Sequence, residues 1–276
     1  MKKHINLFFP QWQGGGQDLS TYKGGLELKH NYFKGIKLDE VPVSTEAVSE
    51  AKHNIIGYAE ISRQLGQAKT LLMQALPETI FTVGGGCDAD IPAVAYLNNR
   101  LKGDLTVLWF DAHGDLNTPA SSASRYFYGM PLRALLGEGE EEIVKLTQPH
   151  LAPPQLIMLG VRDLDPAEKE YIATQNICVF GVTDIEQKVD SVIEAVKSKG
   201  SANIYVHIDL DVIDCVDFPH VPVPAPAGLK LNVFTELLQK LDKEFKIAGL
   251  GLFEYQPSGS PTIELLQDII EIGVRL

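Results

Sequence analysis

Short apolar segments rich in β-branched residues alternate along this chain with longer segments of helical periodicity, and this alternation restricts the fold more than any other feature. The strand candidates are residues 5–9, 36–41, 80–83, 106–110, 155–159, 177–180, 204–208 and 247–253. The helix candidates are residues 44–76, 91–101, 131–136, 166–175, 184–199, 232–245 and 261–272, with Pro166 and Pro261 suited to a first helical turn. Strands that are apolar without alternation are typical of parallel sheets covered by helices on both faces.

We therefore predict an α/β protein with a mostly parallel sheet of about eight strands. The sequence shows no internal repeat, no low-complexity tract and no linker. The proline-rich stretch 219–226 reads as an ordered loop. Residues 1–276 are accordingly expected to form a single domain.

The charge balance limits the partners of the chain. Its 24 Lys and Arg residues stand against 36 Asp and Glu residues, a net charge of −12, and no basic cluster offsets this excess. We therefore expect no nucleic-acid surface and no membrane contact, and we favour small cationic substrates or metal ions. No apolar run approaches the roughly 18 residues of a membrane span. Residues 5–9 are too short for the core of a signal peptide, so we expect a cytoplasmic protein.

Acidic side chains follow several of the predicted strands. Asp111, His113 and Asp115 follow residues 106–110, and Asp209 and Asp211 follow residues 204–208. A spacing of two keeps side chains on one face of an extended segment. At two further strand ends stand Glu254, after residues 247–253, and Cys87, after residues 80–83 and three glycines. Because ligands of parallel sheets bind beyond the carboxyl ends of the strands, these groups are expected to meet in one crevice.

Aspartates collected in a partly dry crevice raise each other's pKa and ionise together only beside cations. Two divalent ions would balance the charge of the aspartates listed above, and carboxylates with an imidazole are typical of two-metal sites that activate water near neutral pH. The alternative is that each Asp-x-Asp pair belongs to a solvated loop or a helix cap. The two motifs together favour a metal centre.

Three segments resemble the arginase, agmatinase and formiminoglutamase family, the ureohydrolases. They are Asp-Ala-His-Gly-Asp-Leu-Asn-Thr-Pro at 111–119, Ile-Asp-Leu-Asp-Val-Ile-Asp at 208–214, and Val-Gly-Gly-Gly-Cys-Asp at 83–88, in place of a Gly-Gly-Asp-His turn. The resemblance extends from Val83 to Pro257. It implies a three-layer α/β/α sandwich, a pair of divalent ions with manganese as the first choice, and hydrolysis of a guanidino or amidino carbon.

The resemblance also implies roles for the metal ligands. Asp111 and Asp209 would bridge the ions, Asp115 would complete one site, and His113 and Asp211 would complete the other. Cys87 stands where the family has a histidine ligand. Because a thiolate is softer than manganese prefers, this site is expected to be weak, empty or retuned toward zinc, iron or cobalt. The alternative is a buried apolar cysteine.

The implied substrate is a small cationic guanidino compound with an amino acid head group. Residues at the positions that bind this head group in arginases are Asn117 and Ser124, for the carboxylate, and Asp163, Asp165 and Glu168, for the ammonium. For the two aspartates the alternative is a helix N-terminus before Pro166. Glu254 matches the family acid that pairs with the guanidinium, and the alternative is a surface acid at the end of a strand.

Two further departures from arginases point to a variant substrate. Tyr128 stands where many arginases have a proton-transferring histidine, and a phenol is a poor base at neutral pH. Val223 stands where a hydroxyl usually faces the guanidinium. N-hydroxy-L-arginine needs less leaving-group protonation and could offer its oxygen to Tyr128, so we hold it beside L-arginine. The products would be an amino acid amine and urea or hydroxyurea, with Asp115 carrying the proton to the leaving amine.

His207 lies two residues before Asp209, where the family usually has a small hydroxyl residue. We expect His207 either to hold the metal-bridging Asp209 in position without binding the metal itself, or to be a hydrogen-bonded core histidine with no influence on the metals. Two other functions remain open, hydrolysis of formimino or other amidine groups, and a binding protein that has lost turnover. The resemblance leaves room for a homo-oligomer, but because the sequence stops soon after its last expected helix, a trimer is not assumed.

Overall fold

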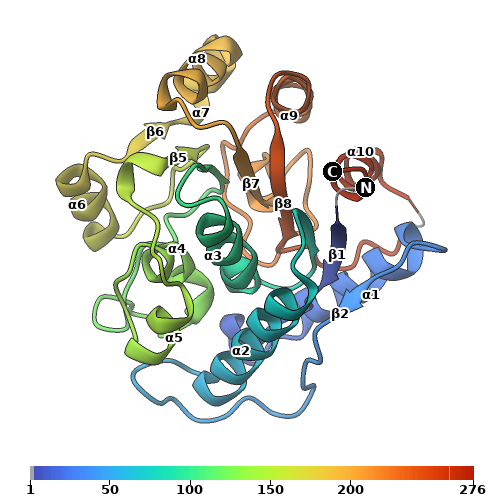
Figure 1. Cartoon of the computed structure of the whole chain (residues 1–276), viewed down its shortest axis with the longest axis vertical. Helices are drawn as coiled ribbons and strands as arrows, with labels where there is room; N and C mark the ends of the chain where they lie inside the picture. The colour runs from blue at the N-terminus through green and yellow to red at the C-terminus, as the bar shows by residue number, and fades with distance from the viewer. Residues whose placement is uncertain (1–2, 261) are drawn as a thin grey trace.

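The protein is described by a computed structural model covering residues 3–260 and 262–276. Within these residues, eight strands form one sheet in the order β2-β1-β3-β8-β7-β4-β5-β6, and all neighbours are parallel (Figure 1). The strands are β1 (His4–Phe8), β2 (Asp39–Glu40), β3 (Thr79–Val83), β4 (Thr106–Phe110), β5 (Leu156–Leu159), β6 (Cys178–Phe180), β7 (Ile204–Asp209) and β8 (Ile247–Phe253). The predicted parallel sheet is confirmed.

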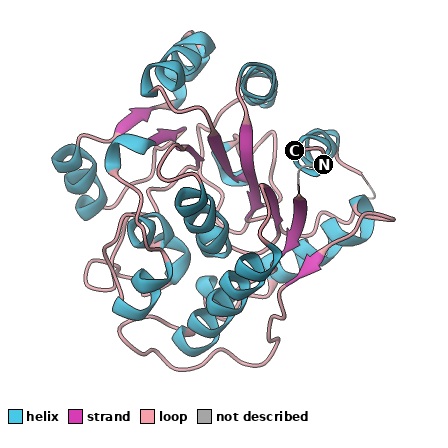
Figure 2. Ribbon diagram, viewed as in Figure 1, coloured by secondary structure: helices cyan, strands magenta, loops and turns pink. Residues whose placement is uncertain are grey.

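Helices cover both faces of the sheet (Figure 2). They are α1 (Ser20–Tyr32), α2 (Tyr58–Ala75), α3 (Ile91–Arg100), α4 (Pro131–Leu135), α5 (Glu141–Leu146), α6 (Pro166–Gln175), α7 (Val182–Gln187), α8 (Val189–Lys199), α9 (Leu231–Glu244) and α10 (Glu264–Val274). Apolar residues of α2 to α6 pack into the core on one face, and those of α1 and α7 to α10 pack into the core on the other. The chain therefore has the three-layer α/β/α arrangement.

Helix α6 shows how the sequence fixes an element that borders the site. Asp165 is its N-cap, and the side chain of Glu168 reaches back to accept from the backbone N–H of Asp165 at 2.9 Å. This capping box satisfies amide groups that the first helical turn leaves without partners. Pro166 occupies the first turn as predicted, whereas Pro261 lies outside the described residues.

The helix predicted over residues 44–76 is wrong in its first part. Helix α2 begins only at Tyr58, because Gly57 (φ 74°), His53 (φ 52°) and Asn54 (φ 60°) take left-handed backbone conformations that a right-handed helix cannot include. The strand predicted over residues 36–41 is also too long. Only Asp39–Glu40 pairs with β1, at the exposed edge of the sheet.

The helix predicted over residues 184–199 is two helices, because Lys188 (φ −155°, ψ 85°) interrupts the helical backbone between α7 and α8. The prediction also missed α1, which contains Gly24 and Gly25, and the short α5. Gly24 lies against the carbonyl of Tyr255, where any Cβ would collide with the oxygen. The low helical propensity of this glycine is therefore overridden by close tertiary packing.

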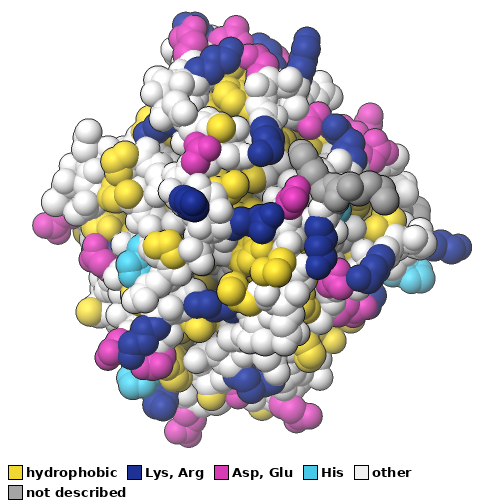
Figure 3. All heavy atoms as spheres, viewed as in Figure 1, with side chains coloured by type: hydrophobic (Ala, Val, Ile, Leu, Met, Phe, Trp, Pro, Cys, Tyr) yellow, Lys and Arg dark blue, Asp and Glu magenta, His cyan; other side chains and the backbone are white. Residues whose placement is uncertain are grey.

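No helix in the described part of the chain is long and apolar enough to cross a bilayer. On the face shown in Figure 3, acidic and basic side chains both occur, with apolar atoms exposed between them.

Candidate metal centre and substrate pocket

The four strands that carry the predicted ligands are neighbours in the sheet, in the order β3-β8-β7-β4. Their carboxyl ends therefore meet at one edge. The turn after β3 depends on glycine, because Gly84 and Gly85 have φ angles of 93° and 88°, and a Cβ on Gly85 would lie 2.3 Å from the carbonyl oxygen of Gln11. This tight turn brings Cys87 over the ends of the neighbouring strands.

The predicted ligands, together with His207 and Glu254, gather into groups; within each group the donor atoms lie within 4.8 Å of one another. Within the described residues these groups are Cys87, Asp111, Asp115 and His207; Cys87, Asp209 and Glu254; and Asp111, His113 and Asp211. They share members, so they form one continuous cluster. The sulfur of Cys87 lies 3.2 Å from Asp209 Oδ2, and the backbone N–H of Cys87 donates to Glu254 Oε1 at 3.0 Å.

The acids of the cluster are buried. Asp111 is 0% exposed, and Glu254 is 7% exposed, so Glu254 is not a surface acid. Burial, followed by neighbouring negative charges, raises the pKa of Asp115, Asp209 and Glu254 well above the usual range. The charged forms of these carboxyl groups are therefore costly unless cations lie beside them.

His113 is the cationic partner of the cluster within the protein. Its Nδ1 lies 2.9 Å from Asp211 Oδ2 and 3.5 Å from Asp111 Oδ1. Burial alone would lower the pKa of His113, but hydrogen bonds to Asp111 and Asp211 raise it to about 12. A single imidazolium cannot balance the surrounding carboxylates, and divalent cations would do so by replacing this proton.

The donor atoms themselves fit metal ions. Among the described residues, Asp115 Oδ2 and His207 Nε2 are buried without a hydrogen-bond partner, and the two residues belong to the same donor group. Asp115 (φ 54°) and Glu254 (φ 57°) are held in left-handed backbone conformations, which are rare outside glycine and concentrate at functional sites. Carboxylate, imidazole and thiolate are all ligands of divalent transition metals.

His207 is a fully buried, hydrogen-bonded histidine, which agrees with the second expectation and not with the first. Its Nδ1 lies 2.8 Å from Asp90 Oδ2, so its hydrogen-bond partner is Asp90 and not Asp209. Its ring stacks on Trp109, whose Nε1 donates to Asp111 Oδ2 at 3.2 Å. Asp90 and Trp109 were not singled out from the sequence, because neither belongs to a motif and only the fold brings them to His207.

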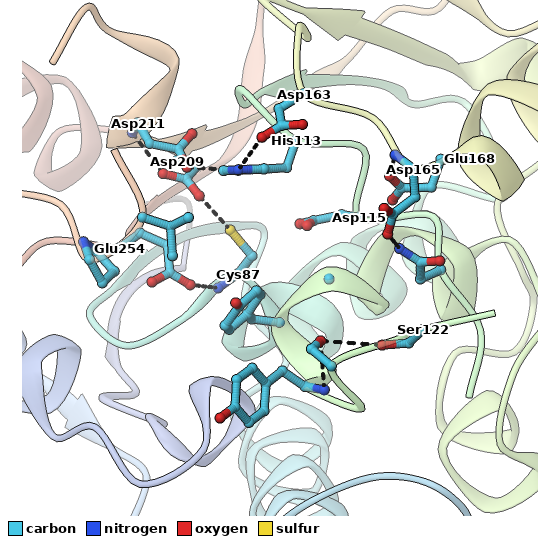
Figure 4. Close-up of a pocket in the computed structure, with 17 residues that line it drawn as sticks. Cys87, His113, Asp115, Ser122, Asp163, Asp165, Glu168, Asp209, Asp211 and Glu254 are labelled. Atoms are coloured by element: carbon cyan, nitrogen blue, oxygen red, sulfur yellow. Dashed lines mark hydrogen bonds and ion pairs between the residues drawn. The ribbon is translucent and has the colours of Figure 1, made fainter. Parts of the chain in front are cut away.

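A pocket opens beside the cluster (Figure 4). Predicted site residues that line it are Cys87, His113, Asp115, Asn117, Ser124, Tyr128, Asp163, Asp165, Glu168, Asp209, Asp211, Val223 and Glu254. Asp111 lies behind this surface. In Figure 4, Glu254 lies on one side, Asp165 and Glu168 lie on the opposite side, and Cys87 and Asp115 lie between them. Ser122, Tyr126, Gly129 and Pro222 also line the pocket but carried no recognisable sequence signal.

Asp163, Asp165 and Glu168 differ in their hydrogen bonds and in their exposure to solvent. Glu168 accepts from the backbone of Leu116 at 2.9 Å, and Asp165 Oδ2 accepts from Asn117 Nδ2 at 2.8 Å. Asp165 stands at the N-cap position of α6, as the alternative predicted, and it lines the pocket as well. Asp163 is outside the helix, and its side chain is 75% exposed and lies 4.0 Å from His113 Nε2. Asp163 is therefore open to a ligand, whereas Glu168 is buried.

Comparisons with known proteins identify the family of the chain. The chain matches the Arginase family over residues 19–270. An arginase of Staphylococcus aureus (strain MRSA252) is 31% identical over 239 residues, which are 84% of this chain and 78% of the relative. The crystal structure of Entamoeba histolytica arginase in complex with L-ornithine has a TM-score of 0.89 at 20% identity and covers 99% of this chain and 98% of that chain. Formimidoylglutamase of Bacillus subtilis has a TM-score of 0.72 at 18% identity, with 100% and 85% covered.

The sheet, the buried ligand cluster and these matches define a metal-dependent hydrolase that cleaves C–N bonds of amidine groups. The family match spans most of the chain. This chain therefore belongs to the arginase family.

Proposed function

We propose that the protein hydrolyses the guanidino C–N bond of an arginine-like amino acid, L-arginine or N-hydroxy-L-arginine. The observation that carries the proposal is the distribution of acids in the pocket. Glu254 lies on one side of the pocket, Asp165 and Glu168 lie on the opposite side, and Asp163 lies beside His113 (Figure 4). A substrate with a guanidinium at one end and an ammonium at the other is complementary to both acidic regions.

Glu254 would hold the guanidinium. One of its oxygens accepts from the backbone N–H of Cys87 at 3.0 Å, which fixes the carboxylate at the edge of the cluster. A carboxylate beside a guanidinium can form two parallel charge-assisted hydrogen bonds, and this would position the trigonal carbon against the metal centre. At the other end, Asn117 and Ser124 would donate hydrogen bonds to the carboxylate, and Asp163 would attract the ammonium.

Two divalent ions, manganese first and zinc, iron or cobalt beside the sulfur of Cys87, would supply an activated water when bound. Cys87, Asp111, His113, Asp115, Asp209 and Asp211 are the residues proposed to hold them. Oδ2 of Asp115 has no hydrogen-bond partner among the described residues, so it is available to accept a proton from the attacking water. Asp115 would then return this proton to the departing amine nitrogen.

Tyr128 would act as a hydrogen-bond donor. Burial and then the charge of Glu254 raise its pKa to about 12, so the phenol keeps its proton at neutral pH. An N-hydroxyl group on the substrate would give it an oxygen to bind. The Entamoeba histolytica arginase with the similar fold holds L-ornithine, which is the amino acid that hydrolysis of L-arginine would leave.

The test is an assay of the manganese-loaded protein for urea from L-arginine and hydroxyurea from N-hydroxy-L-arginine. Glu254→Gln should abolish turnover, whereas Glu271→Gln, on the exposed side of α10, should not change it. Hydrolysis of a formimino amino acid alone would favour the formimino branch. Metal binding without hydrolysis of any guanidino or amidine compound would favour a binding protein.

A further inference from the structure

We propose that His207 is itself a metal ligand, and that its Nε2 completes the group formed by Cys87, Asp111 and Asp115. The proposal rests on the metal dependence in the proposed function but not on its substrate. The four donor atoms lie within 4.8 Å of one another. Ligands at about 2.0–2.3 Å from one ion lie about 3–4.5 Å apart, so this group needs little rearrangement to close around a cation.

The unpartnered nitrogen is the first reason. His207 is 0% exposed, and within the described chain no hydrogen-bond partner reaches its Nε2. Buried polar atoms are nearly always paired, so an orphaned imidazole nitrogen, on a residue grouped with a thiol and two carboxylates, indicates an absent partner. That partner must either accept the lone pair of Nε2 or carry a proton. A divalent cation bound by the neighbouring acids would accept the lone pair.

The contact at the other ring nitrogen is the second reason. Nδ1 of His207 lies 2.8 Å from Asp90 Oδ2, and the hydroxyl of Tyr205 donates to the other oxygen of Asp90. In the tautomer whose Nδ1–H donates to this carboxylate, Nε2 carries the lone pair that a metal ion would bind. Histidine ligands in metalloproteins are commonly oriented by such a carboxylate. Asp90 therefore serves as the positioning residue for His207.

The packing around the ring fixes its direction. His207 stacks on Trp109 with ring centroids 3.4 Å apart, and Phe253 lies nearly parallel to it at 5.1 Å. On the neighbouring strand Gly251 is paired with His207, and a Cβ at this position would lie 2.7 Å from Asp90 Oδ2. Because Gly251 has no side chain, the carboxylate of Asp90 has room to reach His207.

Cys87 stands at the position of the family's histidine ligand. His207 on β7 would therefore supply an imidazole to the same ion that Cys87 would bind. The donor set of this ion would be one sulfur, one nitrogen and carboxylate oxygens, and the set of the other ion would be the nitrogen of His113 and carboxylate oxygens. Sulfur and nitrogen donors favour zinc, iron or cobalt over manganese. The two ions are therefore expected to differ in metal preference.

The test counts histidine ligands directly, in the full-length protein loaded with manganese, cobalt or zinc. Electron spin-echo spectroscopy of the manganese form should detect two coordinated imidazoles in the unmodified protein and one in His207→Gln. Calorimetric titration of His207→Gln with zinc should show at least a 100-fold loss of affinity at one site and no change at the other. Retention of that second site shows that the variant is folded.

The matched control is His4→Gln on β1, because both ring nitrogens of His4 have hydrogen-bond partners. It should keep both sites. Asp90→Asn should weaken the same single site as His207→Gln by about 10- to 100-fold. The proposal is overturned if the unmodified protein shows one coordinated imidazole, or if His207→Gln binds two zinc ions with unchanged affinity. None of these readouts requires turnover, so a failure of the proposed hydrolysis would be seen separately.

Discussion

The imidazole of His207 lies flat against the indole of Trp109, with their planes 4° from parallel. The same indole donates from Nε1 to Asp111 Oδ2 at 3.2 Å. One buried side chain of β4 thus orients both an imidazole and a carboxylate of the proposed metal centre, although it offers no ligand atom itself. Its two contacts can be separated by substitution.

Replacing Trp109 with phenylalanine keeps an aromatic face for His207 but removes the N–H that fixes Asp111. We expect about a tenfold loss of metal affinity and a loss of about 1 kcal/mol in the free energy of unfolding. Titration calorimetry and urea denaturation measure the two quantities. Trp12→Phe is the matched control, because the ring nitrogen of Trp12 donates to the carbonyl of Ser44 at 2.8 Å, outside the donor groups. Equal metal affinity in the two variants would contradict this role of Trp109.

Asp163→Asn should raise the KM for L-arginine about tenfold, equivalent to about 1.4 kcal/mol, with little change in kcat. The carboxylate is 75% exposed at the pocket, so it can attract the substrate's ammonium without belonging to the metal cluster. Steady-state kinetics should show the effect for L-arginine and not for a guanidino acid that lacks the α-amino group. Glu170→Gln, an exposed acid on α6, is the control. A KM rise for both substrates would rule out recognition of the ammonium.

Tyr128→Phe should lower kcat/KM for N-hydroxy-L-arginine about tenfold and leave L-arginine nearly unaffected. The reason is that a phenol with a pKa of about 12 donates a hydrogen bond, and only the hydroxylated substrate offers it an additional oxygen. Competition between the two substrates, followed by urea and hydroxyurea production, measures the difference. Tyr96→Phe is the control, because the hydroxyl of Tyr96 donates to the carbonyl of Pro77 at 3.1 Å and Tyr96 does not line the pocket. An equal loss on both substrates would remove the argument for the hydroxylated one.

Asp88 should make the protein less stable as the pH rises. Burial raises its pKa from 3.8 to about 7, against the effect of its hydrogen bond from Gln11. Between these values the native state holds a proton that the unfolded state has lost, so the free energy of unfolding falls as the pH rises to about 7 and levels off above it. Asp88→Asn removes this dependence. Its free energy of unfolding, relative to that of the unmodified protein, should therefore rise by on the order of 3 kcal/mol from pH 5 to pH 8.

Urea denaturation at the two pH values tests the role of Asp88. The control is Asp39→Asn, whose carboxylate pairs with Lys37 near the edge strand β2. A difference between Asp88→Asn and the unmodified protein that does not vary with pH would show that Asp88 is ionised in the folded state throughout.

Much of the architecture was predictable from local patterns. Strand β8 has the predicted bounds because residues 247–253 form an uninterrupted apolar run, and α6 has them because Pro166 and the capping box define its beginning. The errors arise where tertiary contacts decide. Helix α1 includes Gly24 because the helix approaches the backbone of Tyr255, and the left-handed turn at Gly57 delays the start of α2.

Some residues of the candidate site were likewise predictable from the sequence, and others were not. Asp111, His113 and Asp115 could be recognised because their spacing of two follows a strand and their motif is specific. Asp90 could not, since it becomes relevant only through its hydrogen bond to His207, 117 residues away. The free nitrogen of His207 is likewise a property of the packed interior, which no sequence pattern reports.

The central claim is that divalent ions hold together the buried acids at the ends of β3, β4, β7 and β8. Anomalous diffraction from crystals grown with manganese tests it most directly. We expect two anomalous peaks per chain, one among Cys87, Asp111, Asp115 and His207 and the other among Asp111, His113 and Asp211. Crystals soaked in excess manganese that show these carboxylates without any anomalous peak between them would contradict it.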